Sequence, residues 1–369
     1  MTAAIACPVC RADHIGSLLR PKSLRDGHKA LAQGKIDEAR FAAIQADAIR
    51  ESVAMQEAAG MGAVTDGEFR RRSWFAGFVD GVDGLVHKDT YFKFVGGDAA
   101  TVSVPVPFAE APIRRIAGIT THEFDFVKDV ATKPVKITMP APSVIHFHRG
   151  PDCADTAVYP DPDKYWADLV AVYRDEIVDL GQRGLTYLQL DEVPIALLCD
   201  ENVRARIEDW GWAWEELLDI YIRSSNAAIE AAPETMTVGM HMCRGNYRGK
   251  WIGTGGYEPV AERLFNEVNA DVFLLEYDSD RAGDFEPLRF VPSDKSIVLG
   301  LVSTKTPVME DESELKRRIE AASKYVPLDR LAISPQCGFG TTVGGAPMDE
   351  EAERRKLELV ARVADDMWE

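Results

Sequence analysis

Short apolar runs separated by longer polar stretches recur along the whole chain. The runs are rich in β-branched residues and are apolar at nearly every position rather than at every second one. This pattern is typical of strands in a parallel sheet that is covered on both faces. The eight runs predicted to be strands are residues 12–17, 62–68, 135–142, 186–192, 237–243, 271–276, 296–303 and 331–337.

Between most of these runs, apolar residues recur at the three- and four-residue spacing of an amphipathic helix. The clearest example is 162–181, with Asp161 as the expected N-cap, Pro162 at the first helical position and Gly181 as the expected C-cap. A final charged helix is predicted over 349–368. Strands that alternate with helices indicate an α/β protein, and eight strands favour a single (β/α)8 TIM barrel.

One stretch interrupts this alternation. Residues 70–130 contain the Gly-rich sequence GFVDGVDG and the alternating sequence TVSVPVPF. We interpret them as a long insertion after the second strand, with a β-hairpin at the rim of the barrel. Insertions of this length in compact domains are often functional. No repeat or low-complexity linker divides the chain, so residues 1–369 are predicted to form one domain.

The overall charge disfavours some classes of partner. The 369-residue chain has a formal net charge of −18, which disfavours nucleic acid. No signal peptide or membrane-spanning apolar stretch is recognised, so we expect a cytoplasmic protein with reduced cysteines and no membrane partner. Cys7 and Cys10 have the spacing of half a zinc knuckle or of a redox pair, but without a second such pair, and with a position before any predicted strand, they are interpreted as incidental thiols. The run from Arg70 to Arg72 is interpreted as a solvated face or as a clamp for an anionic substrate group.

Four residues with metal-binding side chains lie at or just past the ends of predicted strands: His241, Cys243, Glu276 and Cys337. His241 and Cys243 are two residues apart, so strand alternation directs both side chains to the same side. Glu276 ends the run VFLLE and Cys337 ends LAISPQC, and neighbouring strands of a closed ring bring such positions together. Two thiolates, one imidazole and one carboxylate suit tetrahedral Zn²⁺. Taken singly, each cysteine also fits inert packing, and Glu276 fits one half of an ordinary ion pair.

Other polar residues end the same strands, where the catalytic residues of such barrels lie. Asp191 and Glu192 are adjacent carboxylates, which are costly to bury unless they are used. Asp191 is therefore a candidate catalytic and substrate-binding residue, and Glu192 a candidate substrate-binding residue. Ser17 and Glu68 are further candidate substrate contacts, although Ser17 also suits a helix N-cap and Glu68 a turn. Lys305 is a candidate catalytic proton donor if burial lowers its pKa, or else an anion-binding residue or a surface lysine in a loop.

Several segments carry a resemblance to a known family. They are HIGSLLRP, DGEFRR, LQLDE, HMCRGN, FLLEYD and SPQCGFG, and they extend over nearly the whole chain. At these segments the chain resembles the catalytic domain of cobalamin-independent methionine synthase, in the superfamily that also contains uroporphyrinogen decarboxylase. The resemblance implies that the four metal-binding residues ligate a catalytic zinc. It also implies that Ser17, Glu68 and Asp191 hold the amino and carboxyl groups of a homocysteine-like acceptor.

The chain departs from the family pattern in two places. Family members end the seventh strand with an aspartate and a histidine, a proposed proton donor, whereas this chain has Ser303 and Lys305. Family members also have a tryptophan after the third strand that stacks on the pterin ring, but KITMPAPSVIHFH contains none. Folate is therefore disfavoured as the methyl donor. His146 and His148 are alternative residues for the cavity mouth, although such a pair is more often structural.

These observations predict a zinc-dependent thiol alkyltransferase that moves a methyl group to homocysteine or a related thiol. Zn²⁺ lowers the pKa of a bound thiol and so supplies the thiolate nucleophile. Three alternatives remain open: thiol addition to another electrophile as in epoxyalkane:coenzyme M transferases, a metal-free decarboxylase of the uroporphyrinogen type, and a zinc-binding regulatory or storage barrel. The expected partners are a small-molecule thiol and an alkyl donor, with a homo-oligomer as a further possibility.

Overall fold

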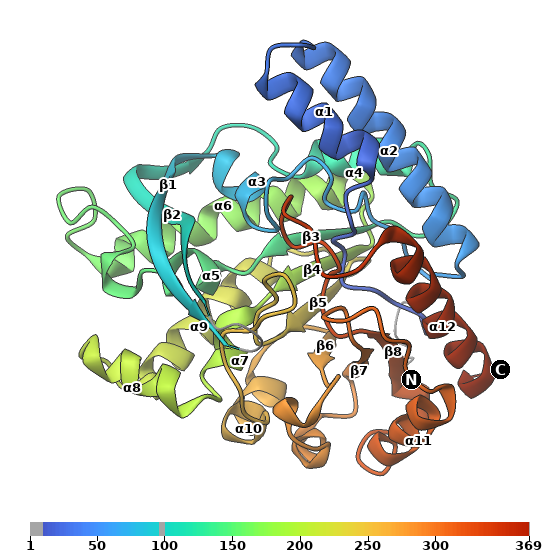
Figure 1. Ribbon diagram of the computed structural model, residues 1–369. Helices are drawn as coiled ribbons and strands as arrows, with labels where there is room; N and C mark the ends of the chain where they lie inside the picture. Colours follow the sequence, from blue (N-terminus) through green and yellow to red (C-terminus); the bar gives the residue numbers. More distant parts are fainter. Residues whose placement is uncertain (1–9, 96–99, 369) are drawn as a thin grey trace.

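Six parallel strands form the centre of the computed structural model, which describes residues 10–95 and 100–368 (Figure 1). The strands are hydrogen-bonded in sequence order, and every residue in five of them is buried. They are β3 (Lys136–Pro140), β4 (Tyr187–Asp191), β5 (Thr237–Met242), β6 (Val272–Glu276), β7 (Ser296–Val302) and β8 (Leu331–Pro335). Because neighbouring strands run in the same direction, their carboxyl ends meet at one edge of the sheet.

Two short segments connect the outer strands of this sheet. Ala12 pairs in parallel with Ile333 of β8, and Val64 pairs in parallel with Val135 just before β3. The two segments also contact each other, since the Gly62 N–H donates to the Ala12 carbonyl at 2.9 Å. Eight extended segments thus complete the ring expected from the apolar runs. The α/β fold of TIM-barrel type is confirmed, although the first two segments make single bridges rather than full strands.

The helices surround this ring in Figure 1. The longer ones are α1 (Lys22–Ala32), α2 (Glu38–Ala58), α4 (Thr121–Lys128), α6 (Pro162–Arg183), α8 (Glu201–Asp209), α9 (Trp214–Ile229), α10 (Glu258–Glu267), α11 (Glu312–Ala322) and α12 (Glu350–Trp368). Short helices are α3 (Ala76–Asp80), α5 (Pro142–Phe147) and α7 (Val193–Leu197), with 3-10 turns at Gly150–Asp152, Asp280–Ala282, Glu286–Phe290 and Leu328–Arg330.

Helix α6 shows where the sequence pattern was accurate and where it was wrong. Asp161 caps the helix by accepting a hydrogen bond from the Asp163 N–H at 3.0 Å, as expected. Gly181 does not end it, because the helix continues to Arg183 and Gly184 is the left-handed cap with φ 94°. Gly181 is instead a packing position, since a β-carbon there lies 3.0 Å from the Pro233 ring. Close approach, not chain reversal, accounts for this glycine.

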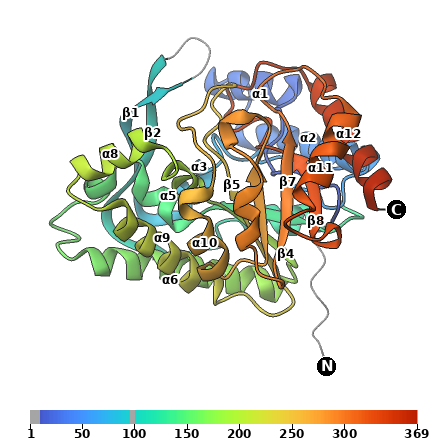
Figure 2. The ribbon, with the colours of Figure 1, turned by 90° about the horizontal axis from the view of Figure 1, so that it is seen from below.

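A long antiparallel hairpin lies within the expected insertion at 70–130. Its strands are β1 (Val82–Phe94) and β2 (Ala100–Arg115), and Figure 2 shows it projecting beside the barrel. A bulge after Asp83 uses Gly84 at φ 91°, where a β-carbon lies 2.5 Å from the Pro112 carbonyl oxygen. Val95 pairs with Trp251, so the end of β1 is fastened to the loop that follows β5. The hairpin is therefore positioned over the carboxyl ends of the strands.

Other expectations have different outcomes. In the described part of the chain, no helix is both long enough and apolar enough to cross a membrane. Cys7 lies outside the described residues, and Cys10 is a buried free thiol. The assignment of the whole chain to one domain stays a prediction.

Candidate metal centre and substrate cavity

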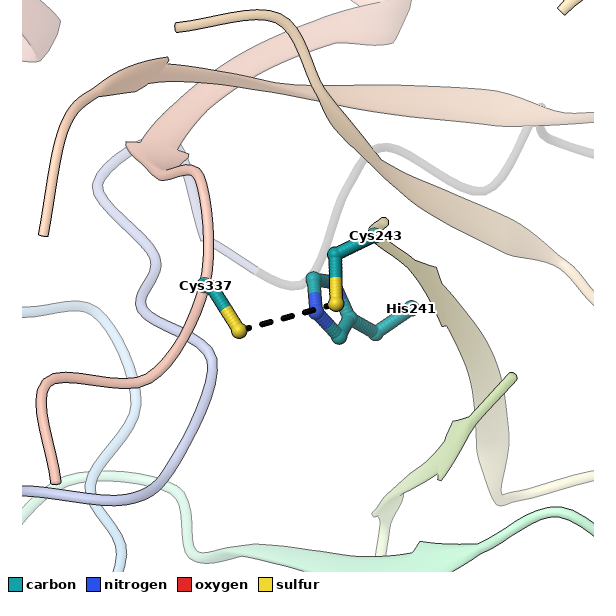
Figure 3. A group of neighbouring side chains, drawn as sticks. All are labelled: His241, Cys243 and Cys337. Atoms are coloured by element: carbon teal, nitrogen blue, oxygen red, sulfur yellow. Dashed lines mark hydrogen bonds between the residues drawn. The ribbon is translucent and has the colours of Figure 1, made fainter. Parts of the chain in front are cut away.

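Three of the four predicted ligands converge at the carboxyl ends of two strands. His241 is the penultimate residue of β5, Cys243 follows that strand directly, and Cys337 lies two residues after β8. One ligand atom from each of the three lies within 4.8 Å of the other two, and all three side chains are buried. The two sulfur atoms are 3.6 Å apart, and Figure 3 shows Cys337 facing Cys243 beside the His241 ring.

The orientation of the His241 ring leaves one nitrogen free for a metal. Its Nδ1 lies 3.1 Å from the Leu274 carbonyl oxygen on β6, which assigns the ring proton to Nδ1. Its Nε2 is buried and has no hydrogen-bond partner among residues 10–95 and 100–368. A histidine whose second nitrogen donates to a backbone carbonyl is the usual arrangement of a metal ligand. The Nε2 lone pair is thus held in a fixed direction by the neighbouring strand.

The sulfur geometry fits a tetrahedral zinc ion. Zinc–sulfur bonds of about 2.3 Å at a tetrahedral angle place two sulfur atoms about 3.8 Å apart, close to the observed 3.6 Å. The Cys337 thiol donates to Cys243, which lowers the pKa of Cys243 well below its usual value and raises that of Cys337. The two sulfur atoms thus share one proton. A divalent metal ion can displace that proton and bind both sulfur atoms as thiolates.

Glu276, the fourth predicted ligand, is held by cationic neighbours. Its carboxylate accepts hydrogen bonds from the Arg244 N–H at 2.5 Å, from the Lys305 Nζ at 3.2 Å and from Arg281. Burial opposes ionisation here, but Lys305, Arg244 and Arg281 outweigh it and lower the pKa of Glu276 to about 2. Glu276 is therefore an ionised residue outside the group of three, and its role as a metal ligand stays a prediction.

One cavity joins the metal-binding group to the predicted substrate residues. Its empty space is about 850 Å³, counting the part that is open to solvent, and Ser17, Glu68 and Asp191 line it together with His241, Cys243 and Cys337. The strand register contributes to this arrangement, because Asp191 of β4 is paired with His241 of β5. The structure thus brings together six of the nine residues singled out as site residues.

Two carboxylates in this cavity have oxygen atoms to offer a ligand. Asp191 accepts one hydrogen bond from Gln189 at 2.7 Å, and burial raises its pKa to about 7. Glu68 accepts from the Thr138 hydroxyl at 2.8 Å, while none of the described groups donates to its other oxygen. Burial also raises the pKa of Glu68, whose backbone adopts the left-handed conformation at φ 59°. Such a backbone is uncommon for a glutamate and is often found at functional sites.

Besides Glu276, two predicted site residues do not line the cavity. One Glu192 oxygen accepts the Ile195 N–H at 2.8 Å and so caps α7, while the other accepts the Ser143 hydroxyl. The expected substrate contact of Glu192 therefore has no support from its position. Lys305 is buried, and its ammonium group lies 3.2 Å from Glu276 and 3.7 Å from Asp278. It is neither a surface lysine nor a group that reaches into the cavity.

The arginine run and the histidine pair each divide into different roles. Arg71 is buried, binds Glu123 through two nitrogens and donates to the Thr138 carbonyl at 2.8 Å, so the expected solvated face is wrong for this residue, and the substrate clamp stays a prediction. Arg72 is exposed. His148 lines the cavity, whereas His146 is stacked on Trp212 at an interplanar angle of 10° and serves packing.

Sequence reasoning missed the aromatic part of the cavity. Trp74, Phe75, Phe92, Phe94 and Tyr247 all line it, and they come from the insertion and from the loop after β5. The only signal for Phe92 and Phe94 was their two-residue spacing, which places both on one face of a strand. The chain lacks the family's tryptophan after the third strand, but Trp74 reaches the cavity from another loop.

Comparison with known proteins identifies the family. The sequence model of one protein family, described as the catalytic domain of cobalamin-independent synthase, matches residues 11–364. The chain belongs to this family. The chain is 36% identical to the Bacillus subtilis protein YxjG over 98% of its own length and 95% of that protein. It is 25% identical to a methionine synthase of Pyrococcus abyssi, covering 90% of this chain and 87% of that one.

A solved structure of a Listeria monocytogenes protein, assigned as a vitamin-B12-independent methionine synthase, has a similar fold. It superimposes with a TM-score of 0.76 at 33% identity, over 97% of this chain and 98% of the Listeria chain. The resemblance stated from the sequence is therefore confirmed. At the level of the family, the activity is methyl transfer of the methionine synthase type, which favours this reaction over a decarboxylase.

Proposed function

We propose that this cobalamin-independent synthase domain is a zinc-dependent thiol methyltransferase whose acceptor is homocysteine or a related amino-acid thiol. The observation that carries the proposal is the unpaired Nε2 of His241 beside two sulfur atoms 3.6 Å apart. These three atoms border the same cavity as Ser17, Glu68 and Asp191. Zn²⁺ held by His241, Cys243 and Cys337 supplies the positive charge that keeps an acceptor thiol ionised at neutral pH.

The chain's own residues orient the acceptor. Asp191 and the unpaired oxygen of Glu68 attract its ammonium group, and the bound cation in turn lowers the pKa of both carboxyls. Ser17 offers its hydroxyl to the acceptor carboxylate. Gly338 is required beside it, because a β-carbon at that position lies 1.9 Å from the Ser17 Oγ. We assign Lys305, the candidate proton donor, to holding Glu276 in place through their 3.2 Å contact.

Aromatic rings exclude water from the reacting sulfur. Phe75, Phe92 and Phe94 are all buried and line the cavity that contains the metal-binding group. A thiolate that is not hydrated attacks carbon faster, since less solvent must be displaced in the transition state.

Zinc-edge X-ray absorption on the purified protein tests the proposal. We expect one zinc per chain with two sulfur and two nitrogen or oxygen neighbours, and a third sulfur neighbour after homocysteine is added. Cys243→Ser and Cys337→Ser should each lose the metal, whereas Cys153→Ser, which changes a buried free thiol outside the group, should retain it. If homocysteine adds no sulfur neighbour, the proposed chemistry is wrong.

The same measurement separates the nearest alternative. A coenzyme M acceptor carries a sulfonate, which requires a basic contact, yet none of the described residues lining the cavity is a lysine or an arginine. The carboxylates of Glu68 and Asp191 instead suit an acceptor with an amino group. A third sulfur neighbour obtained with coenzyme M but not with homocysteine would reverse this choice. A cytoplasmic location and a homo-oligomer stay predictions.

A further inference from the structure

Six aromatic rings form a continuous arc along the wall of the cavity. They are Trp74, Phe75, His148, Phe92, Phe94 and Tyr247, and all six line the cavity. Taken in that order, the centroids of neighbouring rings are 5.2, 5.5, 5.2, 6.1 and 4.7 Å apart. These spacings are those of rings in mutual contact. The arc therefore presents a continuous aromatic surface to whatever occupies the cavity.

Backbone contacts fix the arc in place. Phe92 and Phe94 belong to β1, and the next residue of the chain, Val95, exchanges two hydrogen bonds with Trp251 at 2.7 and 3.1 Å. Phe94 stacks on Tyr247 with an interplanar angle of 20°. The hairpin and the loop after β5 thus hold each other, and their rings are ordered before a ligand binds. Such preorganisation reduces the entropy cost of binding.

The charges that border the cavity are acidic. Its lining includes the carboxyl groups of Glu68 and Asp191, and none of the described lining residues is a lysine or an arginine. His148 adds no charge at neutral pH, because burial and the neighbouring Arg206 lower its pKa to about 4. Arg71 lies 3.4 Å from Glu68 but is committed to Glu123. With the acceptor ammonium group on Glu68 and Asp191, the aromatic rings remain to receive a second cation, while the lack of a lysine or arginine among the described lining residues disfavours an anion.

We propose that the methyl donor is a small cation, a methyl sulfonium or a quaternary ammonium compound, whose positive centre lies against the aromatic arc. This inference rests on the proposed function, since it names the donor for the same methyl transfer. The face of an aromatic ring attracts cations, and cages of several rings are the known way in which proteins bind alkylated ammonium groups.

Methyl transfer from such a donor to the acceptor thiolate consumes and releases no proton. The acceptor thiolate forms a bond to the methyl carbon, the bond from that carbon to the donor sulfur or nitrogen breaks, and its electron pair stays on that donor atom. The onium cation leaves as a neutral thioether or tertiary amine and the thiolate becomes a neutral thioether, so the leaving group needs no acid. This agrees with the position of Lys305, whose ammonium group is bound to Glu276 and Asp278 instead of the cavity. A donor whose leaving group departs as an anion requires a proton donor instead.

Binding to the zinc-loaded protein tests the arc directly. Choline and 3,3-dimethylbutan-1-ol have the same shape, but only choline is charged. We expect choline to bind about tenfold more tightly, and Phe92→Leu or Phe94→Leu to reduce this preference by several-fold. Tyr91→Leu is the matched control, because Tyr91 belongs to the same strand but is 78% exposed and does not line the cavity. Equal binding of choline and the alcohol overturns the proposal.

Transfer is measured by mass spectrometry of methionine formed from homocysteine. Trimethylsulfonium and dimethylsulfonioacetate are the expected donors, compared with 5-methyltetrahydrofolate and methylcobalamin. If the third sulfur neighbour appears at zinc but only the folate or the cobalamin supports transfer, the donor proposal is wrong and the proposed function stands. If homocysteine never reaches the metal, the proposed function fails, and the comparison of choline with its neutral analogue still decides whether the arc selects cations.

Discussion

Replacing Glu192 by glutamine separates its role as a helix cap from a role in substrate binding. Glu192 is fully buried, and burial raises its pKa from 4.5 to about 7. Its two oxygens accept hydrogen bonds from the Ile195 N–H and the Ser143 hydroxyl. A glutamine keeps both contacts, because its amide oxygen accepts from the Ile195 N–H and its amide N–H donates to the Ser143 oxygen. The substitution thus removes the charge and little else.

The sign and size of the effect follow from the pKa. Below pH 4.5 the carboxyl is protonated in the folded and unfolded states, so burial costs no ionisation energy. Between pH 4.5 and 7 the unfolded state loses its proton first, and the stability of the wild type falls as the pH rises. The two values differ by about 2.5 pH units, each equal to about 1.36 kcal/mol, so the full penalty is about 3 kcal/mol above pH 7.

Urea unfolding of Glu192→Gln and wild type at pH 5 and pH 8 measures this difference. At pH 8 we expect the variant to be more stable by up to about 3 kcal/mol, and at pH 5 by less than about 1 kcal/mol. Glu192→Ala loses both hydrogen bonds and should be less stable than Glu192→Gln by about 1 to 2 kcal/mol at either pH. Glu215→Gln, at an exposed glutamate of α9, controls for loss of charge alone. If Glu192→Gln is stabilised equally at both pH values, or is less stable than the wild type at pH 8, the reasoning is refuted. If instead the KM of Glu192→Gln for homocysteine is raised, Glu192 does contact the substrate.

Further predictions concern the other charged residues. Arg71→Met leaves Glu123 and Glu68 buried without their cation, so unfolding free energy measured in urea should fall by about 3 to 5 kcal/mol. Asp191→Asn removes the charge that attracts the acceptor ammonium group, and steady-state kinetics should show a KM for homocysteine raised about 10- to 100-fold. In the wild type, acceptor affinity should weaken as the pH falls below about 7, because Asp191 then takes up a proton. His241→Gln should weaken zinc binding at least about tenfold in a competition with a metal-binding dye.

The ring of strands was predictable because a covered parallel strand must be apolar on both faces. Six of the eight apolar runs coincide with β3 to β8 to within two residues at most ends. The runs at 12–17 and 62–68 make only single bridges, at Ala12 and Val64, and each run contains a glycine outside the extended conformation, Gly16 at φ 128° and Gly67 at φ 69°. Apolar character indicates where a segment is buried, but not how long it stays paired.

The same alternation rule that located the metal-binding group also separates Asp191 from Glu192. His241 and Cys243 are two residues apart and were placed on one side of the strand for that reason. Asp191 and Glu192 are adjacent, so the rule directs them to opposite sides, yet both were assigned to the substrate. The structure has Asp191 in the cavity and Glu192 at the start of α7. The aromatic arc was beyond prediction, since its rings are joined only by the path of the insertion and the loops.

The departure from the family pattern at Ser303 and Lys305 is explained by their neighbours. Lys305 lies between Glu276 and Asp278, and the Ser303 hydroxyl donates at 2.8 Å to the same Asp278 oxygen that Lys305 contacts. A histidine at 305 is shorter and mostly neutral at pH 7, so it compensates two buried carboxylates less well than a lysine. The lysine therefore belongs with the acidic pair in FLLEYD rather than with the leaving group. A chain that uses this position for charge compensation does not have it available as an acid, and a donor that departs as a neutral molecule removes the need for one.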